Sequence, residues 1–196
     1  MFLGRAFDST LLCPISAIAP QSANPTVETM KQTQQLLDYI AMQKEAIITY
    51  SRSDMKLAVH SNVSYLSELK ARSRAGGHLF LSKEAAIPLN NGVIINISHI
   101  IKHIITSATE AELAALYIMA REAVYIIIVL EEMVDKHPPT PLQTDNDMAD
   151  ELCNSKIQPK RKKSTYIRLH WLRDRECQNN LEYIGDQEIK LRGLLE

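Results

Sequence analysis

The sequence predicts an α/β fold, a mixed β-sheet with helices packed on it and a helical lead at the N-terminus. Three strand-like segments precede a long apolar helix, and another strand-like segment and further helices follow it. Sheets and amphipathic helices each have an apolar surface to bury, so this order favours helices layered on a sheet. A chain of 196 residues with 45% hydrophobic content is long enough to build such a core.

Residues 1–53 are expected to be mostly helical. Pro20 and Pro25 bracket a polar turn, and Thr26 and Glu28 open the segment after it. Residues at helical spacing then follow: Met30, Gln34, Leu37, Ile40 and Ala41. We therefore expect a helical N-terminal part that is distinct from the α/β part beginning at residue 54.

Three antiparallel strands are expected next. Residues 55–62 alternate as a strand does, with Leu57 and Val59 on one side. Asn91-Gly92 is a strong turn signal between two further apolar runs. The three expected strands are 55–62, 78–82 and 93–98.

Residues 107–134 form the clearest predicted helix. Its start has two alternative capping boxes, Ser107 with Glu110 or Thr109 with Glu112. A pair of prolines follows its end. The apolar stripe of this helix contains Leu113, Leu116, Tyr117, Ala120, Val124, Ile127 and Ile128.

The rest of the chain predicts a strand at 142–146, a short helix at 147–153 and a helix around 166–177. Between the two helices, five basic residues fall within 156–163. The predicted order of strands and helices completes a mixed α/β layer fold.

Net charge, the length of the apolar runs and the cysteine count limit the classes of protein to which this chain can belong. A net charge of −1 describes a soluble globular chain and neither requires nor excludes a nucleic-acid partner. The longest apolar run, 124–130, is too short to span a bilayer, so no membrane partner is expected. Cys13, Cys153 and Cys177 are odd in number and lack metal-ligand spacing, which favours a reducing intracellular compartment, cytoplasmic or nuclear.

Three positions carry the candidate chemistry. Glu112 stands at a helix start and Asp145 at a strand end, a pairing that two-metal nucleases use. Asn62 stands at another strand end, where such a site would have an aspartate. Each has a structural alternative: Glu112 in a capping box, Asp145 as a helix N-cap, and Asn62 as an ordinary polar residue.

Residues 54–175 resemble the ribonuclease H domain of copia-type LTR-retrotransposon Pol polyproteins. Residues 1–53 are similar to the connection between reverse transcriptase and that domain, and no Tyr-x-Asp-Asp polymerase motif occurs. The resemblance implies a ribonuclease-H-like mixed sheet over 54–180 and an origin within a larger polyprotein. The matching motifs are Ser61-Asn62-Val63, 71–78, 107–116, Thr144-Asp145-Asn146 and His170-Trp171-Leu172-Arg173-Asp174.

The family's reaction is Mg²⁺-dependent hydrolysis of the RNA strand in an RNA–DNA hybrid. By resemblance, Glu112 and Asp145 match two of four metal-binding acids, and Asn62 occupies the position of the first. We find no match to the motif that carries the fourth acid. An amide brings no negative charge, so two Mg²⁺ ions would be under-neutralised here. The resemblance implies a degenerate ribonuclease H with little or no activity.

A non-enzymatic remnant that binds nucleic acid, or that has a structural role, is the alternative. The basic residues Lys160, Arg161, Lys162 and Lys163 could bind phosphates, although a solvated loop is the simpler interpretation. His170 fits either the cleft or a solvent-facing position. Trp171 is interpreted as core packing.

Residues 181–196 match nothing in the family as written. Back-translation permits an adjacent reading frame that resembles the family's ending, so we hypothesise that this tail is frameshifted. The coding DNA tests the idea, which fails if the codons there do not support the alternative frames.

Overall fold

The computed structural model describes residues 2–6, 8–43, 45–85, 87–133, 136–154 and 163–185. Two compact units make up the chain, Met1–Thr49 and Tyr50–Glu196. The first unit therefore ends at residue 49, four residues before the predicted boundary at residue 53.

The N-terminal unit is helical. It contains α1 (Phe2–Ala6), α2 (Leu12–Ile18) and α3 (Val27–Met42), with short 3-10 turns at Ser9–Leu11 and Ala19–Gln21. Thr26 begins α3 through a reciprocal cap, because its Oγ1 accepts from the Thr29 amide at 3.1 Å and its own amide donates to Thr29 Oγ1. This cap fixes the helix start that the sequence predicts.

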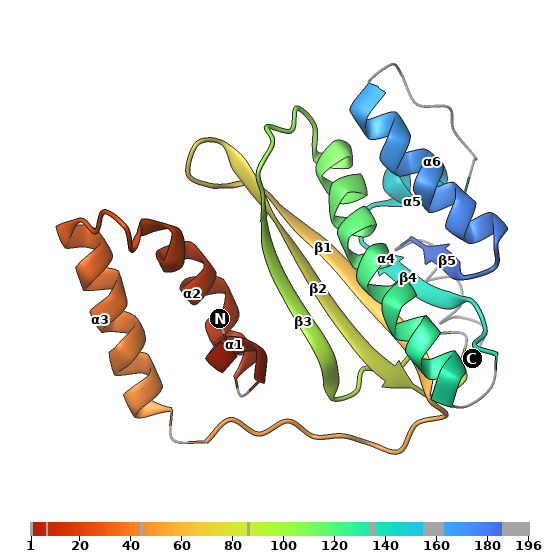
Figure 1. Cartoon of the computed structure of the whole chain (residues 1–196), viewed down its shortest axis with the longest axis horizontal. Helices are drawn as coiled ribbons and strands as arrows, with labels where there is room; N and C mark the ends of the chain where they lie inside the picture. The colour runs from red at the N-terminus through yellow and green to blue at the C-terminus, as the bar shows by residue number, and fades with distance from the viewer. Residues whose placement is uncertain are drawn as a thin grey trace. The chain divides into compact units, whose positions relative to one another are not determined.

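The second unit is built on a five-stranded mixed sheet with the order β3-β2-β1-β4-β5 (Figure 1). The first three strands pair antiparallel, whereas β4 pairs parallel with β1, and β5 pairs parallel with β4. This order and these directions make the ribonuclease-H-like sheet that the resemblance implies. The strands are β1 (Lys56–Glu68), β2 (Arg72–Ser82), β3 (Val93–Ile101), β4 (Thr140–Thr144) and β5 (Leu181–Ile184).

The last strand was not expected. The segment 181–196 was predicted to be an atypical tail, but Leu181–Ile184 forms β5. The Tyr183 hydroxyl donates to the Leu172 carbonyl at 2.9 Å, which fastens the strand to the helix before it. Because β5 has only four residues, its alternation is too short to recognise as a pattern. Residues 186–196, where the fourth acid would follow, lie outside the described residues.

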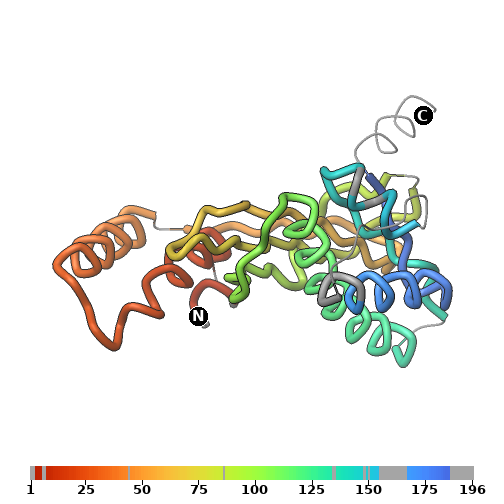
Figure 2. Tube along the Cα trace, turned by 90° about the horizontal axis from the view of Figure 1, so that it is seen from above, coloured from red at the N-terminus to blue at the C-terminus, as the bar shows by residue number. Residues whose placement is uncertain are grey.

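Helices α4 (Ala108–Met133) and α6 (Lys163–Cys177) lie on the same face of the sheet (Figures 1 and 2). Helix α4 packs on β1 and β2, and its buried side includes Met119 and Ala123. The predicted apolar stripe is displaced at its end, since Ile128 is 49% exposed. By length and composition α4 could cross a membrane, yet half of its most apolar stretch is buried inside this unit.

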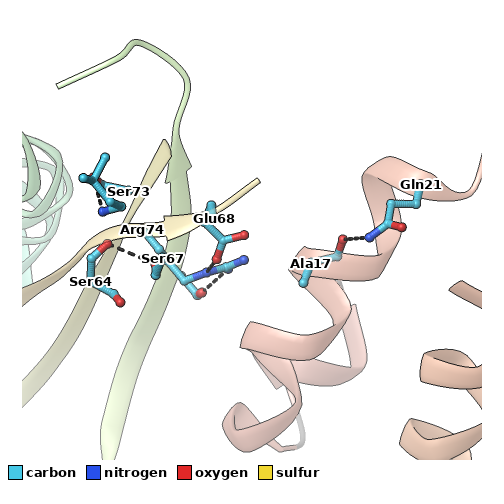
Figure 3. A network of polar contacts seen from close by, with 9 residues as sticks. Ala17, Gln21, Ser64, Ser67, Glu68, Ser73 and Arg74 are labelled. Carbon is cyan, nitrogen blue, oxygen red and sulfur yellow. Dashed lines mark hydrogen bonds and ion pairs between the residues drawn. The ribbon is translucent and has the colours of Figure 1, made fainter. Parts of the chain in front are cut away.

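The hairpin between β1 and β2 is held by polar contacts (Figure 3). Arg74 donates from Nε to the Glu68 carboxylate at 2.6 Å, and Ser73 Oγ accepts from the Leu66 amide at 3.1 Å. Leu66, Lys70 and Ala71 have positive φ angles, so this turn contains strained backbone without a glycine. The contacts offset that strain.

Adjacent glycines in β2 give a matched test of the packing of α4. A side chain at Gly77 would overlap Met119, a fully buried residue, whereas the nearest atom to a Cβ at Gly76 is the Asn62 carbonyl oxygen at 3.8 Å. We expect Gly77→Ala to lower the free energy of unfolding by about 1–3 kcal/mol, as overpacking does. Gly76→Ala should change it by less than about 1 kcal/mol.

Urea unfolding of both variants measures the difference. An equal loss in the two variants would contradict this account, because Gly76 does not face Met119.

Candidate functional site

The candidate site lies where β1 and β4 run side by side in parallel. The last paired residues of the two strands are Ser61 and Thr144. Asn62 and Asp145 therefore follow at the same end of neighbouring strands. Strand β4 ends at Thr144, whereas β1 continues to Glu68. The edge of β1 beyond Ser61 is therefore not paired with β4.

Glu112 reaches this strand end from the first turns of α4. The helix is capped by Ser107, whose Oγ accepts from the Glu110 amide at 3.2 Å, while Glu110 accepts from the amide and hydroxyl of Thr106. The alternative box of Thr109 with Glu112 is wrong, because Ser107 already provides the cap. Glu112 is thus not needed to begin the helix.

Asp145 is also not needed as a helix cap. The N-cap of α5 (Asp147–Cys153) is Asn146, whose Oδ1 accepts from the Ala149 amide at 3.1 Å. The alternative that Asp145 caps this helix is therefore wrong. Asp145 remains exposed at the strand end.

Burial and charge both act on Glu112. Glu112 is only 6% exposed. This burial, together with the nearby charge of Asp145, raises the pKa of Glu112 to about 7. A hydrogen bond from the Val63 backbone opposes this rise. The structure therefore brings Glu112 and Asp145 close together, and the Glu112 carboxyl titrates near neutral pH.

Asn62 lies at the same strand end but is exposed. It directly precedes Val63, the residue whose backbone bonds to Glu112. Ser61 is buried and Val63 packs against the core, so by strand alternation Asn62 projects to the opposite face of the sheet from these two. A ligand shared by Asn62 and Glu112 would have to lie at the edge that β4 leaves uncovered.

The donor set fits one hard divalent cation. Glu112 Oε2 is buried and has no hydrogen-bond partner among the described residues, so it is an orphaned oxygen that a cation would satisfy. Two carboxylate charges balance one Mg²⁺ ion. No group of three or more His, Cys, Asp or Glu side chains suited to a metal occurs in the described part of the chain. The residues present do not fit two ions.

The other predicted residues are the basic cluster 160–163, His170 and Trp171. Lys160, Arg161 and Lys162 are outside the described residues, and of Lys163 only the backbone at the start of α6 is described. His170 is exposed on that helix. Trp171 is half-buried and packs edge-on against Tyr117 with ring centroids 5.2 Å apart, which confirms that it packs against the core.

Two neighbours of the site were missed. His60 on β1 and Gln143 on β4 are register partners, and each has a buried nitrogen without a hydrogen-bond partner among the described residues. Burial and the nearby His78 lower the pKa of His60, and Gln143 opposes this. In the sequence, His60 and Gln143 are marked only by their positions directly before Ser61 and Thr144. Their proximity became visible only once the structure showed that β1 pairs with β4.

Fold and site together define a ribonuclease-H-like α/β domain with two converging carboxylates. No family model matches the sequence, and no curated protein matches it. Solved structures similar to this chain include the N-terminal RNase H domain of a Mycobacterium tuberculosis protein, with 12% identity over 72% of this chain and 91% of that chain and a TM-score of 0.46.

Two further structures are similar. RNase H1 from the archaeon Halobacterium salinarum has 10% identity over 71% of this chain and 93% of that chain, with a TM-score of 0.46. The foamy viral protease–reverse transcriptase has 15% identity over 82% of this chain and 29% of that chain, with a TM-score of 0.47. The fold assignment rests on the strand order and directions described above.

Proposed function

We propose that the chain is a degenerate ribonuclease H domain from a copia-type retrotransposon Pol polyprotein, with half of its metal site retained. One observation carries the proposal: Glu112, buried and with an Oε2 atom that lacks a hydrogen-bond partner among the described residues, lies near Asp145 at the shared end of β1 and β4. Its sequence motifs, in matching order, support the family. The ancestral substrate would be the RNA strand of an RNA–DNA hybrid.

Glu112 and Asp145 would hold one Mg²⁺ ion. When two such ions are bound, one activates water and the other stabilises the leaving oxygen. This chain's own residues supply two charges, and Asn62 can add only one neutral amide oxygen. A second ion would therefore lie in an under-neutralised site, and we expect little or no cleavage.

Cation stoichiometry tests this proposal. Titration of the full chain with Mn²⁺, followed by electron paramagnetic resonance of the free ion, should give one site per chain. Glu112→Gln should abolish that site because it removes one of the two ligand charges. The exposed Glu132→Gln, farther along the same helix, is the matched control and should bind as the native chain does.

Two ions per chain would show that a further carboxylate completes the site. No ion at all would show that the two carboxylates are not a metal site.

We also propose that the protein works in a reducing compartment. Its three cysteines, Cys13, Cys153 and Cys177, all lie among the described residues and form no disulfide there. Free thiols persist in cytosol and nucleus, where a retrotransposon protein would act.

A further inference from the structure

A second polar site lies away from the carboxylate pair. A surface pocket of about 210 Å³ is lined by residues from the end of β3, the loop after it, α4 and α6. Four basic residues contribute to its wall, and we call them the basic pocket cluster: His99, Lys102, His103 and Arg168. Its apolar lining includes Ala114 and Ile118 of α4.

Arg168 is held in place by two contacts. Its Nη1 lies 2.9 Å from His103 Nε2, and its guanidinium lies 5.8 Å from the ring centre of Tyr117. Arginine stays protonated, so Arg168 donates and His103 Nε2 accepts. His103 is therefore neutral in this contact, with its proton on Nδ1. An arginine that is already ordered loses less freedom when it binds a ligand.

No acidic residue lines this pocket in the described part of the chain, although the carboxylate of Glu110 acts on His103 from the start of α4. Burial and the charge of Arg168 lower the pKa of His103, and Glu110 opposes them. The Glu110 carboxylate accepts from Thr106 at the start of α4. Basic groups thus crowd together without an acid in the pocket wall, and an anion would relieve this crowding.

We infer that this pocket binds a phosphate group, either free or within a nucleic-acid strand. Phosphate is tetrahedral and multiply charged, and a guanidinium offers it two parallel N–H donors. The guanidinium of Arg168 and the ammonium of Lys102 supply positive charge, and the neutral imidazole of His103 can donate a hydrogen bond from Nδ1. The apolar lining lowers the local dielectric constant and strengthens these contacts.

The pocket is distinct from the carboxylate pair. At 100° per residue, Tyr117 and Ile118 lie roughly 140° and 240° around α4 from Glu112. The two sites thus use different sides of one helix. Phosphate binding here does not rest on the proposed cation site, and either inference can fail without the other.

Imidazole NMR of the full chain tests the inference. Inorganic phosphate should shift the ring nitrogen signals of His99 and His103 in the native chain, with saturation. Arg168→Gln should weaken phosphate binding by about tenfold or more, since it removes a charge-assisted hydrogen bond. Lys102→Gln, at an exposed position, should weaken it without affecting the fold.

Arg175→Gln is the matched control. Arg175 lies on the same helix, with its guanidinium 5.3 Å from the ring centre of Trp171, but outside the pocket. Its removal should leave phosphate affinity unchanged. Thermal unfolding of each variant checks that the domain remains folded.

A short RNA–DNA hybrid is the second probe. If the hybrid shifts the same signals and depends on Arg168, the phosphate belongs to a strand; if only inorganic phosphate does so, the ligand is a free phosphate. Both results support the site. Unchanged His99 and His103 signals with both probes would overturn it, as would equal affinity in the native chain, Arg168→Gln and Lys102→Gln.

Discussion

Glu112→Gln is expected to raise the free energy of unfolding at pH 8 by up to about 3 kcal/mol in the absence of divalent cations. Burial and Asp145 raise the pKa of Glu112 from its ordinary value of 4.5 to about 7. A difference of one pKa unit between the folded and unfolded states corresponds to about 1.4 kcal/mol of stability. Glutamine keeps the shape of the side chain and removes the charge that the folded state disfavours.

The sign follows from proton binding. Below pH 4.5 Glu112 is protonated in both folded and unfolded states, so it has no effect. Between 4.5 and about 7 the unfolded chain releases the proton while the folded chain keeps it, so stability falls as pH rises. Above pH 7 the loss is complete.

Urea unfolding at pH 5 and pH 8, in EDTA, measures this difference. The native chain should lose more stability than Glu112→Gln between these two values. Glu132→Gln should follow the native chain. Parallel pH profiles for the native chain and Glu112→Gln would contradict the account, because Glu112 would then ionise without a penalty.

Asn62→Asp is expected to strengthen Mn²⁺ binding by about a hundredfold or more. The added carboxylate would stand at the end of the β1–β4 pairing, where it could reach a cation bound by Glu112 and Asp145 at the edge of β1 that β4 leaves uncovered. A charge about 4 Å from another, at an effective dielectric constant of about 20, contributes about 4 kcal/mol, so a hundredfold gain is a conservative expectation. Calorimetric titration with Mn²⁺ measures the change.

Ser64→Asp is the matched control, since Ser64 is exposed on β1 two residues further along. It adds the same charge to the same strand, farther from Asp145. Equal gains in both variants would mean that net charge, and not position, controls cation affinity. No gain in Asn62→Asp would mean that residue 62 does not face the ion.

The fold was largely predictable because its longer elements follow simple periodicities. Helix α4 has 26 residues, enough for a helical stripe to appear, and the expected strands 55–62, 78–82 and 93–98 fall almost wholly within β1, β2 and β3. Strands β1 and β2 were expected to be shorter than observed because residues 63–68 and 72–77 are mostly polar or glycine and show no clear alternation. The pairing of β4 with β1 and β5 joins segments far apart in the chain. Periodicity does not encode such pairing, and the four-residue β5 was missed.

The site was predictable only in part. Position in the sequence indicated Glu112 and Asp145, but their capping alternatives could be removed only once Ser107 and Asn146 were seen to provide the caps. The phosphate pocket was not predicted. His103 and Arg168 are 65 residues apart, and no local pattern marks either of them.

Cleavage of a labelled RNA–DNA hybrid by the purified native chain, in Mg²⁺ and in Mn²⁺, tests the central claim most directly. The account predicts no cleavage above that of Glu112→Ala, because two carboxylates cannot neutralise two ions. Cleavage by the native chain that Glu112→Ala abolishes would contradict it, and would make this protein an active nuclease with asparagine in place of the first acid.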